Sequence, residues 1–183
     1  MIRIRLPMNK LFYYIICITL ISSCSEGDII DNDISNFTAE LEKCSNQEEN
    51  TFVFFKTDTQ INQSLSLGFT STTFELDTAP EDLITTITLN ENTNTLIYRQ
   101  FESKINGAEY FCSSVPPSGI NVTQELKSSD GNAEIKYVIK NEDATSITYT
   151  RTITLINITL IGPDISIRQE SLEFGQDEIT VLK

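Results

Sequence analysis

Apolar and polar residues alternate with a period of two along much of the chain, and this pattern predicts β-strands. The positions between the apolar ones are mostly Ser, Thr, Lys or Glu, as in a sheet with one face on the core and one in water. No segment shows sustained helical periodicity. The alternating apolar positions are Leu65, Leu67 and Phe69; Leu83, Ile87 and Leu89; Ile135, Tyr137 and Ile139; and Ile147, Tyr149, Ile153 and Leu155.

Clusters of Asn, Asp and Gly lie between these runs and predict turns. The segment Asp130–Asn132 (DGN) is a strong hairpin signal, because both central residues of such a turn must tolerate positive φ. It separates a run at 122–126 from one at 135–139, and a polar segment at 141–143 then leads into a long run at 145–161. The pattern predicts a three-stranded antiparallel meander over 120–161.

The run at 145–161 is too long for one flat strand. Its apolar residues occupy odd positions through Leu155 and even positions from Ile156, so we expect a β-bulge or a bend from one sheet to another. Several strands and one corner-turning strand predict an all-β fold, an antiparallel two-sheet β-sandwich, with a β-barrel as the alternative. Phe52–Phe55 (FVFF) fits a buried strand better than a binding stripe.

Residues 36–183 are expected to form one domain, because no segment repeats at a fixed period and no Pro- or Gly-rich linker divides them. Pro116 and Pro117 cannot lie in a central strand. We therefore expect the chain to leave the sheet there in an extended connection.

The first 23 residues have the three parts of an export signal. A basic segment precedes an apolar run at 11–21 (LFYYIICITLI), which is followed by two serines. The run has about half of the ~20 residues that a membrane-spanning helix needs, so it fits a signal better than an anchor. Met8 is an alternative start, since the basic residue and the apolar run still follow it. The basic residues are Arg3, Arg5 and Lys10.

Ile21-Ser22-Ser23-Cys24 resembles the lipobox of bacterial lipoproteins. In that family the cysteine receives a diacylglyceryl group, type II signal peptidase cuts before it, and the new amine is usually acylated. The resemblance implies cleavage between Ser23 and Cys24 and a covalent lipid on Cys24, which would hold the protein durably on a membrane. An ordinary secretory signal with a chance cysteine is the alternative.

Residues 24–35 are acidic and too polar to pack, and they predict a short flexible tether. Glu26 and Asp28 resemble the acidic signal of surface-exported lipoproteins of the Bacteroidota, which implies the outer membrane and its outer face. A solvated linker in the periplasm is the alternative. Further along, Tyr98-Arg99, Tyr110-Phe111-Cys112 and Val115-Pro116-Pro117 resemble the arrangement in envelope lipoproteins of the Flavobacteriia, which implies no particular activity.

The net charge excludes one class of partner. The whole chain carries −13, and the part after residue 23 holds all 26 acidic residues but only 10 basic ones, a charge of −16. A field of that sign repels phosphates, so we expect no nucleic-acid partner and no adsorption on anionic lipid. Solubility alone accounts for such a charge, and cations or basic partners are the alternative.

Cys44 and Cys112 remain once Cys17 leaves with the signal and Cys24 takes the lipid. Two cysteines in an oxidising compartment predict a disulfide, which would join the segment before Pro116 to a first strand expected around Phe37–Leu41. Two buried free thiols or a reactive pair are the alternatives.

The chain contains no histidine, which removes Ser-His-Asp and Cys-His catalysis and most catalytic zinc sites. It has no Gly-rich phosphate loop, nucleophile elbow or Cys-x-x-Cys pair. We therefore expect no cofactor, no resident metal and no enzymatic activity. Carboxylate pairs at 48–49 and 81–82 leave a hydrolase as an alternative, and Asp31 with Asp33 leaves a calcium site.

Three further residues carry hypotheses. Arg99 and Arg151 lie in strand-like runs, where charges usually point outward; an ion pair with a neighbouring strand or a ligand site is the alternative. Asp77-Thr78-Ala79 resembles the O-glycosylation motif of Bacteroidota proteins, which implies modification of Thr78.

The sequence thus predicts a lipid-anchored protein of the cell envelope that acts as a binding or structural module. An accessory subunit of an outer-membrane uptake or motility complex is the alternative. The expected contacts are the membrane, through the lipid, and an envelope protein or a glycan.

Overall fold

A computed structural model describes residues 34, 37–44, 51–70 and 72–183. The predicted signal peptide and lipidation site therefore lie outside the described residues. Within them, no helix is long and apolar enough to cross a membrane. Ile34 is buried in the core although the sequence places it in the tether, so the prediction for 24–35 is wrong at this residue.

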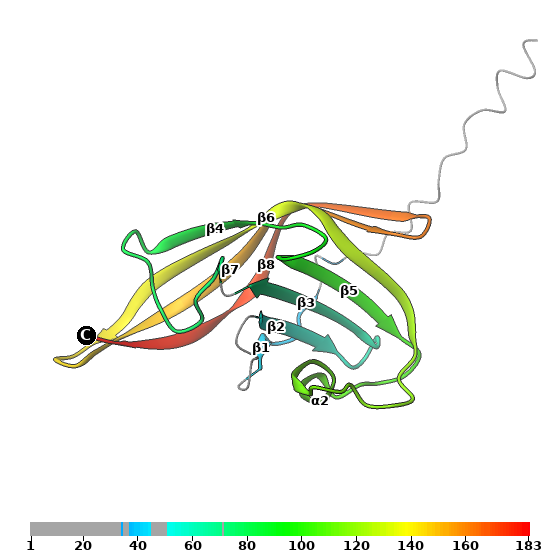
Figure 1. The fold of residues 1–183 in the computed structure, drawn as a ribbon, viewed down its shortest axis with the longest axis horizontal. Helices are drawn as coiled ribbons and strands as arrows, with labels where there is room; N and C mark the ends of the chain where they lie inside the picture. The colour runs from blue at the N-terminus through cyan, green and yellow to red at the C-terminus, as the bar shows by residue number, and fades with distance from the viewer. Residues whose placement is uncertain (1–33, 35–36, 45–50, 71) are drawn as a thin grey trace, which may run out of the picture. The chain divides into compact units, whose positions relative to one another are not determined.

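The described residues form eight strands and one short helix (Figure 1). They are β1 (Glu42–Lys43), β2 (Thr51–Asp58), β3 (Gln63–Thr70), β4 (Ile84–Thr88), β5 (Thr95–Phe101), α2 (Gly107–Cys112), β6 (Val122–Glu142), β7 (Ser146–Gly162) and β8 (Ile165–Leu182). The helix is too short to leave a periodic signal in the sequence. It starts at Asn106, whose side chain accepts a hydrogen bond from the Glu109 N–H.

The predicted all-β fold is confirmed, but the strands form one sheet rather than the two of a sandwich. All pairs are antiparallel, in the order β1-β2-β3-β5-β6-β7-β8, with β4 also paired to β6. The sheet curls into a half-barrel (Figure 1). The long strands β6 and β7 bend without losing their pairing, so the chain turns the corner inside a single sheet.

The predicted hairpin at Asp130–Asn132 is wrong. Strand β6 continues through this segment without a turn. It pairs with β5 over 122–127, with β4 over 132–136 and with β7 along most of its length. Gly131 has a φ of +124°, and its N–H donates to the Asp130 carboxylate at 2.7 Å. The positive φ that suggested a turn serves a β-bulge instead.

The predicted bulge in the long strand is confirmed. Between paired positions, Asn157 and Ile158 of β7 lie opposite the single residue Gly131 of β6, and Asn157 has a φ of +51°. Burial in β7 shifts here from odd positions through Leu155 to even positions from Ile158. The two irregularities face each other, which is where the sheet bends.

The core lies on one face of the curled sheet, where two segments that are not strands cover it. Phe37 and Leu41 come from the segment before β1, and Phe74 and Leu76 come from the loop between β3 and β4. The prediction that Phe52–Phe55 is a buried strand is confirmed, since Phe54 and Phe55 are almost completely buried. The expected first strand at Phe37–Leu41 is wrong, because only Glu42 and Lys43 pair with β2.

Candidate functional site

The face of β2, β3 and β5 opposite the core forms a trough along β3. The β3 side chains on this face are small, Ser64, Ser66 and Gly68, whereas Leu65 and Leu67 on the other face are fully buried in the core. Neighbouring strands place Val53 beside Gly68 and Ile97 beside Ser66. Larger residues therefore flank a floor of small ones.

Helix α2 forms one wall of the trough. Phe111 stacks on Phe55 of β2 with ring centroids 4.9 Å apart. Gly107 permits this approach, because a Cβ there would lie 2.5 Å from Thr57 Oγ1 and 2.7 Å from the Phe55 ring. The wall is thus packed directly on the sheet.

The predicted disulfide between Cys44 and Cys112 is confirmed, with the two Cα atoms 5.1 Å apart. Cys112 is the last residue of α2, and Cys44 follows β1. The bond ties the helix and the segment after it to the strand edge of the sheet. It therefore fixes the wall of the trough covalently.

Arg99 of β5 lies at the edge of the trough. Its Nε donates to Glu125 Oε2 of β6 at 2.6 Å, and its guanidinium carbon lies 5.9 Å from the centre of the Tyr110 ring. Its two terminal nitrogens make no hydrogen bond with the described residues. Lys127 also pairs with Glu125, at 3.3 Å. Burial raises the pKa of Glu125, but Arg99 and Lys127 outweigh it, and the pKa lies below its usual value.

Together these residues enclose a hollow of about 410 Å³. That size lies within the range of small-ligand sites. Its lining combines apolar side chains, hydroxyl groups and one arginine: Thr51, Val53, Ser66, Gly68, Thr95, Ile97, Arg99, Tyr110, Phe111, Ser113, Ser114 and Pro116. We refer to this hollow as the β3 groove.

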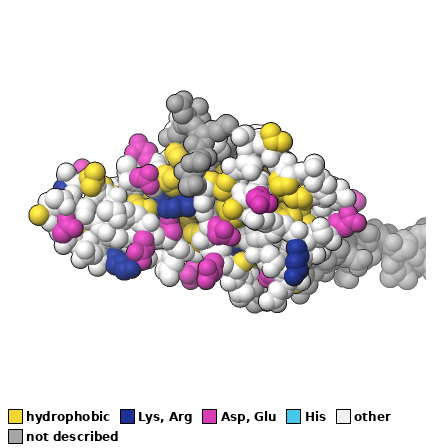
Figure 2. Space-filling model, turned by 90° about the horizontal axis from the view of Figure 1, so that it is seen from below, with side chains coloured by type: hydrophobic (Ala, Val, Ile, Leu, Met, Phe, Trp, Pro, Cys, Tyr) yellow, Lys and Arg dark blue, Asp and Glu magenta, His cyan; other side chains and the backbone are white. Residues whose placement is uncertain are grey.

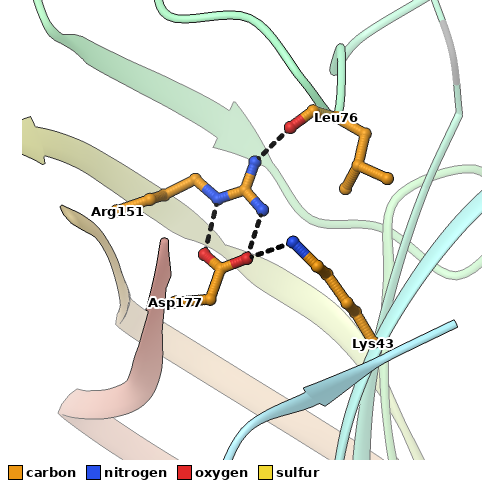
Figure 3. Close-up of polar contacts among 4 residues, drawn as sticks. All are labelled: Lys43, Leu76, Arg151 and Asp177. Carbon is orange, nitrogen blue, oxygen red and sulfur yellow. Dashed lines mark hydrogen bonds and ion pairs between the residues drawn. The ribbon is translucent and has the colours of Figure 1, made fainter. Parts of the chain in front are cut away.

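A second polar cluster surrounds the buried Arg151 (Figure 3). The Arg151 side chain is completely buried and binds Asp177 of β8 through two hydrogen bonds of 2.8 and 2.7 Å. It also donates to the Leu76 carbonyl at 2.6 Å, and Lys43 reaches Asp177 at 2.8 Å. Phe54 and Phe74 lie 5.0 and 5.3 Å from its guanidinium carbon. Arg151 has no exposed side-chain surface, whereas Asp177 and Lys43 are partly exposed. The cluster joins β7, β8, β1 and the β3–β4 loop.

Both arginines therefore pair with a carboxylate on a neighbouring strand, and the outward orientation expected for Arg151 is wrong. Its burial is possible because Asp177 and the Leu76 carbonyl satisfy the charge. The nearby Tyr137 hydroxyl has a raised pKa, chiefly because it is buried.

The remaining predicted residues are dispersed. Thr78 is exposed on the β3–β4 loop, where its hydroxyl donates to Glu75 at 3.2 Å beside a hollow of about 450 Å³. The pair at 81–82 lies in an exposed turn of the same loop. Ser23, Cys24, the pair at 48–49 and the Asp31–Asp33 segment lie outside the described residues. Among the residues that are described, no group of three potential ligands could hold a metal ion.

Sequence reasoning missed the β3 groove. The available signal was the alternation of small residues (Ser64, Ser66, Gly68) with large apolar ones in a strand, which marks one face as hollow.

Acidic side chains are spread over the face seen in Figure 2 rather than gathered in one cluster. No protein family, curated protein or solved structure that we compared with the chain matches it.

Proposed function

We propose that this protein is a lipid-anchored binding module of the cell envelope, held on the outer membrane through Cys24 and taking its ligand in the β3 groove without catalysing a reaction. The observation that carries the proposal is the groove itself, a partly apolar hollow with one arginine and several hydroxyl groups that make no hydrogen bond with the described residues. Its wall is fixed by a disulfide and by aromatic stacking, so the site is formed before a ligand arrives.

The disulfide also supports the envelope location. Such bonds persist in oxidising compartments and are rare in the cytosol. Cys44 and Cys112 lie after the predicted cleavage site, so both would be exported with the domain. Export and the bond between them are therefore mutually consistent.

The anchor is tested by replacing Cys24 with Ser. The variant should lose its lipid and leave the membrane fraction, while the domain keeps the unfolding profile of the parent protein. Intact mass and membrane fractionation measure both. A variant that stays membrane-bound and is still cut before residue 24 would contradict the anchor.

The groove is tested with Gly68→Leu. A Cβ at Gly68 meets only Thr95 Oγ1, at 3.4 Å, so the new side chain fills the trough without displacing the sheet. Glycans and peptides extracted from the envelope should perturb the amide NMR signals of residues around the groove in the parent protein but not in the variant. Perturbations confined to other surfaces would overturn the assignment of the groove.

A specific observation favours the second candidate, an accessory subunit of an outer-membrane complex. Strand β8 is 18 residues long and pairs only with β7 among the described strands. An open edge of this kind can accept a strand from another protein. Crosslinking from β8 positions in native membranes should capture a stoichiometric partner if this candidate is correct.

A further inference from the structure

We infer that the β3 groove binds an acidic saccharide, with Arg99 holding the carboxylate of a uronic acid unit. This inference deepens the proposed function and rests on it. Three features of the described residues carry it: terminal nitrogens of Arg99 and nearby hydroxyl groups that have no hydrogen-bond partner among those residues, and a β3 backbone that is paired on both sides.

Arg99 is held so that its terminal nitrogens are available. Glu125 takes the Nε hydrogen at 2.6 Å, and the Tyr110 ring supports the guanidinium group at 5.9 Å. The side chain is about one-fifth exposed, and it lines the groove. A planar guanidinium group that is fixed at Nε offers a two-pronged donor surface, the geometry that matches a carboxylate.

The local charge permits an anion. Among the described residues, Glu125 is the only carboxylate that pairs with Arg99, and Lys127 shares it, so two cations oppose one anion in this cluster. No acidic residue in the described part of the chain lines the groove itself, and physiological salt screens charges that lie beyond about 8 Å. The acidic character of the whole protein therefore does not prevent an anionic group from binding here.

The rest of the lining offers both polar and apolar contacts, which the hydroxyl groups and C–H faces of a sugar ring require. Four hydroxyl side chains on the groove make no hydrogen bond with the described residues, and each can both donate and accept. Apolar side chains line the same groove and can contact the C–H faces of a pyranose. The four hydroxyl residues are Thr51, Thr95, Ser113 and Ser114, and the apolar ones include Val53, Ile97 and Pro116.

The floor argues against a peptide as the occupant. The backbone of β3 is engaged along the groove with β2 on one side and β5 on the other. No strand edge is available there to pair with the amides of an extended peptide, which is how β-sheets usually bind such chains. A saccharide carries its polar groups as hydroxyls and needs only side-chain partners.

The test uses calorimetric titration of the full lipidated protein in detergent with tetragalacturonate and with tetramannuronate. The fully methyl-esterified tetramers serve as uncharged probes of the same shape. At least one acid tetramer should bind, and its ester should bind about 10- to 100-fold more weakly, as expected for loss of a charge-assisted pair. Arg99→Gln should weaken binding of the acid to the same extent and leave the ester unchanged.

Two variants keep the test interpretable. Gly68→Leu leaves Arg99 in place and should abolish binding by filling the floor, whereas Arg168→Gln removes an exposed arginine of β8 and should bind as the parent does. Equal binding of acid and ester would overturn the role of Arg99 but leave the groove as a saccharide site. Absence of binding to both acids, or binding that survives Gly68→Leu, would overturn the inference, while the envelope-extract experiment would still decide the proposed function.

Discussion

Arg151 and Asp177 form a two-pronged ion pair across β7 and β8, with the arginine side chain completely buried and the aspartate side chain 15% exposed. The pair shares its surroundings with the Leu76 carbonyl and Lys43, so one charge cluster joins four segments that are far apart in the sequence. Removing one partner would leave the other charged group buried and unpaired.

We therefore expect Asp177→Asn to lower the free energy of unfolding by about 3–5 kcal/mol. The double change Arg151→Met with Asp177→Leu should cost less than Asp177→Asn alone, because it removes both charges. Urea unfolding measures each value. Lys43→Ala is the control, since its partly exposed ion pair is worth about 1 kcal/mol or less. If Asp177→Asn lowers the free energy of unfolding by less than Lys43→Ala does, the cluster does not stabilise the fold.

The disulfide provides a second prediction. Cys44 and Cys112 close a loop with a sequence separation of 68 residues. Replacing both with Ala should lower the free energy of unfolding by about 4 kcal/mol, mainly by releasing the unfolded chain. Denaturant unfolding of the oxidised parent and of the double variant gives this difference. Reduction of the parent should give the same value, and a disagreement between the two would point to strain or lost packing.

Gly131 should tolerate no side chain. Its φ is +124°, and a Cβ there would lie 2.8 Å from the Ile158 Cα. Gly131→Ala should cost about 3 kcal/mol, from backbone strain and overpacking together. Gly119→Ala is a matched control, because Gly119 also has a positive φ, +83°, but has open space around it. It should cost only about 1 kcal/mol. Equal costs for the two changes would mean that the bulge adapts.

The Tyr98 hydroxyl should make stability depend on alkaline pH. It is buried without a hydrogen-bond partner among the described residues, and burial raises the pKa of Tyr98 to about 12. An unfolded tyrosine ionises near pH 10, so the unfolded state loses its proton first. Stability is therefore complete below pH 10 and falls as the pH rises from 10 to 12.

Tyr98→Phe should remove this part of the alkaline loss, about 3 kcal/mol for two pH units, and should cost little at pH 7. Urea unfolding between pH 7 and 12 compares the two proteins. Tyr149→Phe, at another buried tyrosine of the core, serves as the control for loss of a hydroxyl group. Identical pH profiles for the parent and Tyr98→Phe would contradict the assignment.

The sequence by itself determined the extended character of several strand segments and one irregularity in them. The side-chain period of two is a local property of extended chain, so the runs around Leu65, Ile135 and Tyr149 could be read directly. The phase slip after Leu155 could be read for the same reason, because one extra residue exchanges the two faces of a strand. The pairing of Cys44 with Cys112 was predicted from chemistry and number, since they are the two cysteines of the segment expected to form the domain.

Only the tertiary structure decided which contacts those strands make. A Gly with positive φ fits a hairpin turn and a bulge equally well, and the pairing of β6 with β4, β5 and β7 selected the bulge at Gly131. The burial of Arg151 depends on Asp177 and on a carbonyl 75 residues away, which no local pattern encodes. The β3 groove likewise depends on tertiary contacts. The small side chains of β3 alternate in the sequence, but they line a groove only because the disulfide and the six-residue helix α2 form a wall beside them.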